Sequence, residues 1–193
     1  MRKLVVATKN LGKAREIAEM MADMPFEIVS LADYPDAPEV QESGATFTEN
    51  AIIKATAYAR FTGELVLADD SGLEVDALGG APGVLSSRFA PTDSERNQRL
   101  LDLLHDVAND KRTARFRCVV AVAEPDGDTL TCEGSVEGLI SREPKGENGF
   151  GYDPVFYVPE LDKHFAELTP AQKNALSHRG RALEKAKAML AAR

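Results

Sequence analysis

The sequence predicts an α/β protein whose strands form a mixed sheet. Two observations lead to this fold class. Up to about residue 78, short apolar runs alternate with segments of helical periodicity. Farther along, a hairpin signal at residues 125–128 lies between two apolar runs, and a helical segment follows near the C-terminal end. At 193 residues, the chain has the size of a single domain, or of one domain with two lobes.

The first half of the chain gives three strands and two helices. The expected strands are residues 3–8, 26–31 and 65–68. The first helix is expected after Lys13, because apolar residues then recur on one helical face, at Ala14, Ile17, Ala18 and Met21. The second begins at a capping box, Thr46 to Glu49, and runs to about Arg60. The third strand is expected to end on the polar run Asp69-Asp70-Ser71-Gly72.

The second half gives a hairpin and two more helices. Residues 73–78 fit extended backbone ahead of a glycine-rich loop at residues 79–83. Capping boxes at Thr92 and Thr169 predict two helices, and Pro170 at the start of the second is a favourable first helical residue. That helix is expected to end near Leu190. The hairpin strands are expected at residues 114–123 and 129–137, on either side of Pro125-Asp126-Gly127-Asp128.

The composition is that of an ordinary soluble protein, with 44% hydrophobic and 28% charged residues. No apolar run approaches the roughly 20 residues that cross a bilayer, and the apolar start stops at Ala7, so we expect a cytoplasmic protein with no membrane partner. Cys118 and Cys132 have no CxxC spacing and no neighbouring histidine, which disfavours a disulfide framework or a zinc site. A net charge of −8 disfavours a nucleic-acid polymer as partner but permits a single nucleotide.

A first polar cluster follows the first expected strand and leads into a helix. It consists of Thr8, Lys9, Asn10, Leu11, Gly12 and Lys13. Backbone N–H groups at a helix N-terminus attract anions and Lys13 adds a positive charge, so this segment favours an anionic ligand. It is not a P-loop, because Ala7 replaces the first glycine of that motif and Ala14 replaces its final serine or threonine. The alternative is an ordinary turn in which Asn10 caps the helix.

Paired acids form a second cluster. Asp69 and Asp70 are adjacent, Ser71 follows them, and Glu42 lies in the acidic loop. Adjacent carboxylates repel one another, and a cation makes such crowding tolerable. Mg²⁺ typically takes one or two carboxylates together with substrate phosphates. We therefore expect a magnesium site made by Asp70, Glu42 and Asp69. The alternative is a polar turn.

Two further clusters suit a planar ligand and its polar groups. Gly149 to Pro154 combines two glycines, two aromatic rings and Asp153, which favours a loop that grips a ring, although a simple glycine-rich turn is the alternative. Residues 173–180 include Lys173, His178 and Arg179, donors for carbonyl and phosphate oxygens. On one straight helix Lys173 and His178 would lie about 140° apart. If both touch one ligand, the helix must break near Ser177; the alternative is a basic helix surface.

In this order, the four clusters resemble the inosine triphosphate pyrophosphatase (Ham1-like) family. The resemblance covers nearly the whole chain. It is carried by Thr8, Asn10 and Lys13; by Glu42, Gly44, Phe47, Glu49, Asn50 and Lys54; by the run from Asp69 to Gly83 with Ser87 and Arg88; by Gly149 to Pro154; and by Lys173, Ser177, His178 and Arg179.

The resemblance implies an elongated mixed sheet with flanking helices that form two lobes around a central cleft, in one domain over residues 1–193. It implies a homodimer that uses Mg²⁺ to split inosine, deoxyinosine and xanthosine triphosphates into the monophosphate and pyrophosphate. The segment Thr8 to Lys13 would hold phosphates, and Ser71 would touch the substrate. The base and sugar would be bound by Phe150, Gly151, Tyr152, Asp153, Lys173, His178 and Arg179.

The catalytic roles fall to Asp70, Lys13 and Lys54. An aspartate with an ordinary pKa near 3.9 is a weak base, so we expect Mg²⁺ and Asp70 to activate the attacking water jointly. Lys13 and Lys54 would offset charge that grows on the phosphate oxygens. His178 and Arg179 would donate to the keto oxygen of a 6-oxo purine.

Three positions depart from the family pattern. Lys9 stands where close relatives often have glycine, Gln41 where some have an acid, and Leu85 where an aromatic residue is common. Two other functions compete with this interpretation. A Maf-like nucleotide pyrophosphatase is disfavoured by residues 177–179, and a nucleotide-binding module without catalysis is disfavoured by the acids at residues 69–70.

Overall fold

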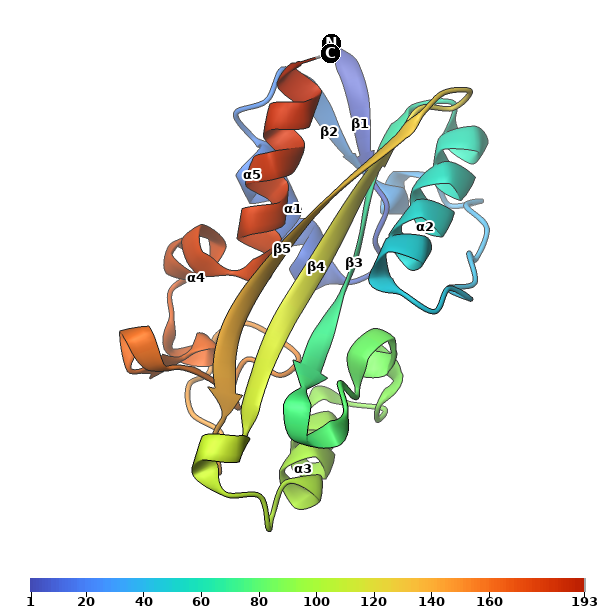
Figure 1. Cartoon of the computed structure of the whole chain (residues 1–193). Helices are drawn as coiled ribbons and strands as arrows, with labels where there is room; N and C mark the ends of the chain where they lie inside the picture. Colours follow the sequence, from blue (N-terminus) through green and yellow to red (C-terminus); the bar gives the residue numbers. More distant parts are fainter. Residues whose placement is uncertain (193) are drawn as a thin grey trace. The chain divides into compact units, whose positions relative to one another are not determined.

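The structure is a computed structural model and describes residues 1–192 (Figure 1). Its strands form one seven-stranded sheet in the order β2-β1-β3-β4-β5-β6-β7. The strands are β1 Arg2–Val6, β2 Phe26–Ser30, β3 Leu65–Val75, β4 Thr113–Ala123, β5 Thr129–Ile140, β6 Phe156–Val158 and β7 Lys163–His164. β1 pairs in parallel with β2 and β3, whereas β6 pairs antiparallel with β5 and β7. The predicted mixed α/β sheet is therefore confirmed.

The α-helices lie close to where the sequence predicts them. They are α1 Leu11–Met21, α2 Phe47–Thr62, α3 Asp93–Leu103, α4 Pro170–Leu176 and α5 His178–Ala191. The capping boxes at Thr92 and Thr169 both form. At α2 only half of the box forms, because the Glu49 carboxylate accepts the Ala45 N–H instead of the Thr46 N–H.

The expected break near Ser177 is present. Ser177 has φ −71° and ψ 162°, an extended conformation that separates α4 from α5. The single C-terminal helix predicted to run to about Leu190 is therefore wrong, and the break that joint ligand contact by Lys173 and His178 requires is confirmed.

The chain forms two compact units. The first comprises residues Met1–Asp70, Cys118–Gly134 and Arg179–Arg193, of which residue 193 lies outside the described part. The second comprises Ser71–Arg117 and Ser135–His178. The strands β3, β4 and β5 each contribute residues to both. The cleft between two lobes stays a prediction.

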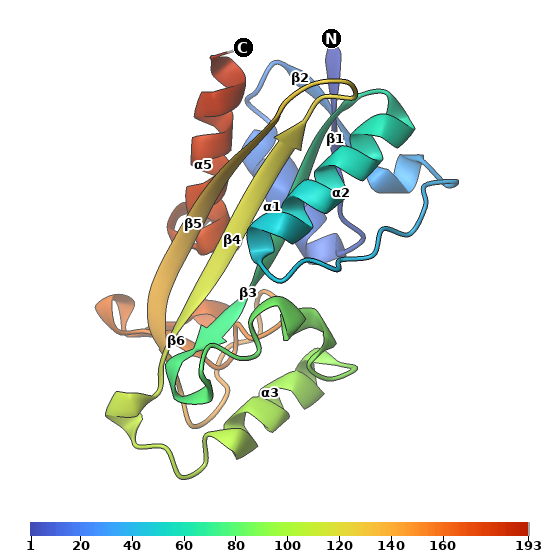
Figure 2. The same ribbon diagram turned by 45° about the vertical axis from the view of Figure 1, so that its right-hand side comes forward.

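The first unit has helices on both faces of its strands. Its core joins alternate residues of β1, β3 and β4 to α1 and α5, and its buried members include Leu4, Leu65, Leu67, Ile17 and Leu183. Figures 1 and 2 show α1 and α5 on one face of these strands and α2 on the other. The buried residues Ala51, Ala55 and Ala59 lie along α2.

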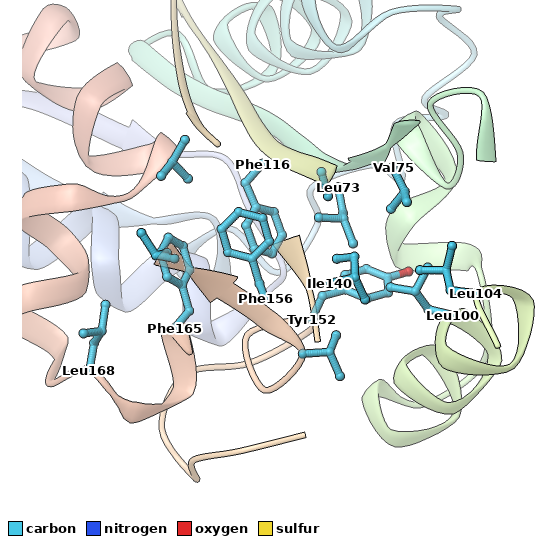
Figure 3. Packing of buried hydrophobic residues seen from close by; sticks show 14 residues of the cluster. Leu73, Val75, Leu100, Leu104, Phe116, Ile140, Tyr152, Phe156, Phe165 and Leu168 are labelled. Atoms are coloured by element: carbon cyan, nitrogen blue, oxygen red, sulfur yellow. The ribbon is translucent and has the colours of Figure 1, made fainter. Parts of the chain in front are cut away.

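The second unit has an aromatic core (Figure 3). The rings of Phe116 and Phe156 have centroids 4.5 Å apart, and Phe156 packs on Phe165 at 4.9 Å. Tyr152, Leu100 and other residues of β3, α3 and β5 complete the cluster. This core contains Tyr152 of the segment 149–153 and Leu100 in the C-terminal half of α3.

The structure differs from the sequence prediction in the middle of the sheet. β3 does not end at Ala68; it continues through Asp69-Asp70-Ser71-Gly72 to Val75. The short strands β6 and β7 were not predicted. Both cysteines are free thiols. None of the helices within residues 1–192 has the length and apolar character needed to cross a membrane.

Candidate active site

β3 places its two adjacent aspartates on opposite faces of the sheet. Successive side chains of a strand point to opposite faces, so Asp69 shares a face with Leu65 and Leu67. Those leucines pack with α1 and α5. Asp70 lies on the opposite face, where Lys54 of α2 is its neighbour. The continuous strand therefore gives the two carboxylates separate surroundings.

The Asp69 carboxylate is buried beside two cations. Its side chain is 1% exposed, and its Oδ2 lies 3.0 Å from Lys13 Nζ and 3.2 Å from Arg179 Nη2. Burial alone would raise the pKa of the Asp69 carboxyl, but Lys13, Arg179 and Lys54 outweigh burial and hold that pKa well below its usual range. Glu16 also accepts a hydrogen bond from Arg179 Nη1 at 2.5 Å. Asp69 is thus an anion that holds two cations in place.

The Asp70 carboxyl has the opposite character. Burial, as the largest cause, raises its pKa above the usual value, and the neighbouring Lys54 only partly offsets this. Asp70 Oδ1 lies 3.5 Å from Lys54 Nζ. Asp70 Oδ2 is buried, and no group in residues 1–192 hydrogen-bonds to it. A buried oxygen in this state lacks a hydrogen bond that a ligand or a water molecule could supply, and Asp69 Oδ1 is in the same state.

Lys54 joins Asp70 to the acidic loop. Its Nζ donates to the Asp69 backbone oxygen at 2.7 Å and lies 3.1 Å from Glu42 Oε1. Burial lowers the pKa of Lys54, but the carboxylates around it more than compensate and raise the pKa overall. The ammonium group therefore stays charged at neutral pH.

Helix α2 also fixes the loop that carries Glu42. The Gly44 N–H donates to Asn50 Oδ1 at 2.7 Å, and the Ala45 N–H donates to Glu49 Oε2 at 2.6 Å. A Cβ on Gly44 would come within 2.6 Å of Glu49 Cβ. This position must therefore be glycine for the loop to approach the helix so closely.

The first predicted cluster forms the N-terminus of α1. Asn10 is the N-cap, and its Oδ1 accepts the Lys13 N–H at 3.0 Å. Thr8 Oγ1 accepts the Asn10 N–H at 3.2 Å. Lys9 is exposed, Leu11 is exposed and Gly12 is half-buried. The alternative of a turn in which Asn10 caps the helix is therefore confirmed. Anion binding by the first N–H groups of α1, which have no intrahelical partner, stays a prediction.

The acids around Asp70 fit a hard cation only in part. No three Asp, Glu, His or Cys side chains within residues 1–192 are grouped so that they could hold a metal ion by themselves. Asp70 offers an unpartnered buried oxygen, and Glu42 belongs to the same cluster through Lys54. Two carboxylates with phosphate oxygens from a substrate suit Mg²⁺. The ion pairs of Asp69 suit it better to holding Lys13 and Arg179 than to a metal.

A second group of predicted residues lies in the second unit. Lys173 Nζ lies 2.6 Å from Asp153 Oδ2, and both side chains are buried. The same Nζ lies 4.4 Å from the centroid of the Phe150 ring, a cation–π contact. Asp153 Oδ2 also accepts the Phe150 N–H at 3.0 Å. Asp153 therefore fixes the aromatic residue and the lysine together.

The other residues of this loop serve its shape. Gly149 has φ +76°, and a Cβ there would lie 2.0 Å from Asp153 Oδ2. Tyr152 belongs to the buried core, and its hydroxyl donates to the Ser86 backbone oxygen at 2.8 Å. Burial raises the pKa of Tyr152. Of the two aromatic residues, Phe150 is the one that remains half-buried.

The remaining predicted residues take different positions. His178 begins α5 and is buried, with its ring stacked on Phe116 at a centroid distance of 4.7 Å. Ser71 follows Asp70 in β3 and is half-buried. Arg179 lies in the first unit and contacts Glu16 and Asp69, so these contacts associate it with Lys13.

Several residues that shape these clusters were not singled out from the sequence as site residues. Glu16 was missed because it is 163 positions away in the chain from its partner Arg179. Asp93 and Asn97 were missed too, although both bind the backbone of Gly151. Their spacing of four residues on one helix face was the available signal.

Known proteins match this chain over nearly its whole length. The sequence model of the Ham1 family matches residues 4–189. A dITP/XTP pyrophosphatase from Desulforamulus reducens is 59% identical over 191 residues, covering 97% of this chain and 95% of the relative. A Ham1 protein structure from Coxiella burnetii has a TM-score of 0.91 and 46% identity with full coverage of both chains. The Ham1 protein of Staphylococcus aureus gives 0.88 and 40%, with 99% of each chain covered.

Proposed function

The chain belongs to the Ham1 family, and on that premise we propose that it is a nucleoside triphosphate pyrophosphatase. Its substrates would be non-canonical purine nucleotides such as dITP, ITP and XTP, which it would split into the monophosphate and pyrophosphate. The names of its relatives, dITP/XTP pyrophosphatases, support this substrate class. Such an enzyme removes damaged nucleotides from the nucleotide pool.

The proposal rests mainly on the different environments of two adjacent aspartates, Asp69 and Asp70. Asp69 is held ionised by Lys13 and Arg179. Asp70 has a raised pKa and an unpartnered buried oxygen. A carboxylate with a raised pKa is a better proton acceptor than an ordinary one. In the proposed reaction Asp70 Oδ2 takes the proton from a water molecule that attacks the α-phosphorus, and pyrophosphate leaves.

The first unit would bind the triphosphate. The N-terminus of α1 offers N–H groups to phosphate oxygens, and Thr8 and Asn10 hold that turn in shape. Lys13 and Lys54 carry positive charge beside the two aspartates. Charge that develops on the phosphate oxygens would be offset by these lysines.

Mg²⁺ is the metal that this donor set suits best. Asp70 and Glu42 would hold it together with phosphate oxygens of the nucleotide. When bound, the ion neutralises charge on the phosphates and makes the attacking water more acidic. Lys54 also holds Glu42 and Asp70 together, because the Lys54 Nζ contacts both carboxylates. Asp69 would support this set indirectly, through Lys13.

The second unit would bind the purine base. Phe150 offers a flat surface and Lys173 a positive charge beside it. A lysine donates but never accepts, so it suits the keto oxygen of hypoxanthine or xanthine and not the amino group of adenine. His178 would add a second donor. We assign Arg179 to holding Asp69, since its carboxylate partners are Glu16 and Asp69.

The oligomeric state belongs to the same proposal. We expect a homodimer, because the family resemblance implies one. Sedimentation equilibrium of the purified protein tests this. A monomer at micromolar concentration would contradict it.

Product analysis tests the proposed function. Purified protein is incubated with Mg²⁺ and, separately, with ITP, XTP, GTP and ATP, and every product is identified by ion-exchange chromatography. We expect monophosphate and pyrophosphate, with ITP and XTP turned over far faster than ATP. Asp70→Asn is the matched control, since it keeps the size of the side chain. Diphosphate with inorganic phosphate, or equal turnover of ATP and ITP, would contradict the proposal.

A further inference from the structure

Helix α3 has one face that is apolar at one end and polar at the other. Asp93, Asn97 and Leu100 recur at helical spacing, and Leu104 follows at the C-cap. Leu100 and Leu104 are buried in the same core cluster as Tyr152, as Figure 3 shows. Asp93 and Asn97 continue this face toward the helix N-terminus. The helix is thus anchored in the core by its leucines, and its two polar residues lie beyond them.

These two polar residues bind both backbone groups of Gly151. The Gly151 N–H donates to Asp93 Oδ2 at 2.8 Å. Asn97 Nδ2 donates to the Gly151 carbonyl oxygen at 3.0 Å. Because the N–H belongs to the peptide shared with Phe150 and the carbonyl to the peptide shared with Tyr152, both peptide planes next to Gly151 are fixed.

The cost of burying Asn97 supports a specific role. Asn97 is buried, and its Oδ1 has no hydrogen-bond partner in residues 1–192. A buried polar atom without a partner destabilises a fold. An apolar residue would avoid this cost and pack with Leu100, but it could not bind the Gly151 carbonyl. The amide is therefore retained for its contact with Gly151.

Gly151 is the neighbour of the ring that the proposed function assigns to the base. Asp153 holds the Phe150 N–H from one side of the loop, and α3 holds Gly151 from the other. Gly151 itself adopts φ +64°, so the chain reverses between these two anchors. The direction of the Phe150 ring and its contact with Lys173 depend on both anchors.

We propose that Asp93 and Asn97 are positioning residues that set base selectivity through the two peptides of Gly151. This inference rests on the proposed function, because it assigns Phe150 and Lys173 to the purine. Neither residue touches the reacting phosphates. Their loss should weaken binding of the base equally in the ground state and in the transition state, which raises KM and leaves kcat nearly unchanged.

Four variants test the proposal. Asn97→Asp keeps the shape of the side chain but sets a carboxylate against the Gly151 carbonyl oxygen. Asp93→Ala removes the acceptor for the Gly151 N–H. Asp93→Asn keeps an acceptor oxygen and should rescue most of the affinity. Asp102→Asn is the control, because Asp102 lies on the exposed side of the same helix, where it accepts a hydrogen bond from Gln98.

The expected kinetic result is a split between the variants. KM for ITP should rise about tenfold in Asp93→Ala, the low end for loss of a hydrogen bond to a charged group at a half-exposed side chain. A similar rise is expected in Asn97→Asp, which sets a carboxylate against a carbonyl oxygen at a buried position. The preference for ITP over ATP in kcat/KM should fall in both. Asp93→Asn should stay within about threefold of the wild type, and Asp102→Asn should match it.

Hydrogen exchange gives a readout that does not depend on activity. The Gly151 amide should exchange faster in Asp93→Ala than in Asp102→Asn, because only the first loses the acceptor. If the wild type hydrolyses ITP but Asn97→Asp keeps the wild-type KM and selectivity, this inference is wrong and the proposed function still stands. A parallel loss of kcat and thermal stability would reduce both residues to a structural role and would also overturn it. If the wild type does not hydrolyse ITP, the proposed function fails first.

Discussion

Replacement of Asp69 by asparagine should destabilise the protein much more than the same replacement at Asp70. The Asp69 side chain is 1% exposed and has Lys13 Nζ at 3.0 Å and Arg179 Nη2 at 3.2 Å. Removing one partner of a buried ion pair costs roughly 3–5 kcal/mol. Arg179 keeps its contact with Glu16, so the low end, about 3 kcal/mol, applies to Asp69→Asn. For a chain of this length, that lowers Tm by about 6–12 °C.

The Asp70→Asn variant should behave in the opposite way. Burial already disfavours the ionised form of Asp70, and Lys54 keeps its contacts with Glu42 and with the Asp69 backbone oxygen. We expect a change in unfolding free energy within about 1 kcal/mol. Turnover of ITP, however, should fall by roughly 10²–10⁴-fold, the usual effect of losing a general base.

Thermal and urea unfolding followed by circular dichroism measure the first variant against the second at neutral pH. The sign of the pH effect follows from the lowered pKa of Asp69. Its contribution to stability is present above its ordinary pKa of 3.8 and is lost as the pH falls below that value, at about 1.4 kcal/mol per pH unit. The difference between the variants should therefore shrink in acid. Equal losses of stability in the two variants at pH 7 would refute the claim that Asp69 stabilises the fold while Asp70 serves catalysis.

Three further outcomes are expected. Gly149→Ala should raise KM for ITP more than Gly151→Ala does in steady-state assays, because both positions have positive φ but only a Cβ at Gly149 would meet Asp153; equal effects would contradict this. The acid limb of the kcat/KM profile should move to higher pH in Lys54→Met, because Lys54 lowers the pKa of Asp70; a limb that does not move would exclude Asp70 as the titrating group. In calorimetry, Mg²⁺ should bind weakly alone and more tightly with a non-hydrolysable ITP analogue, and tight binding without nucleotide would argue against phosphate ligands.

Local sequence signals were sufficient for most of the framework. Thr92 and Thr169 begin helices because the side chain of each accepts the backbone N–H of the residue three positions later. The side chain of that later residue in turn accepts the backbone N–H of the threonine. A break near Ser177 was predicted only on the condition that Lys173 and His178 touch one ligand, since the two cannot share one face of a straight helix. The resemblance of the four clusters to a known family indicated the activity, and the family is confirmed.

Long-range charge pairing determined what the sequence could not show. The run Asp69-Asp70-Ser71-Gly72 has the composition of a turn, yet it remains in β3, where Lys13, Lys54 and Arg179 pair with its charges. The strand conformation then separates the two carboxylates onto opposite faces, which a turn would not do. The partners of Arg179 lie 163 and 110 positions away in the chain, so local patterns could not assign its place.

The central claim is that Asp70 promotes attack of water on the α-phosphorus of a 6-oxo purine triphosphate. Hydrolysis of dITP in H₂¹⁸O, with mass spectrometry of both products, tests it most directly. We expect the label to enter the monophosphate, pyrophosphate to stay unlabelled, and Asp70→Asn to form the labelled product at least about 100-fold more slowly. Label in pyrophosphate or in inorganic phosphate, or an unchanged rate in the variant, would contradict it.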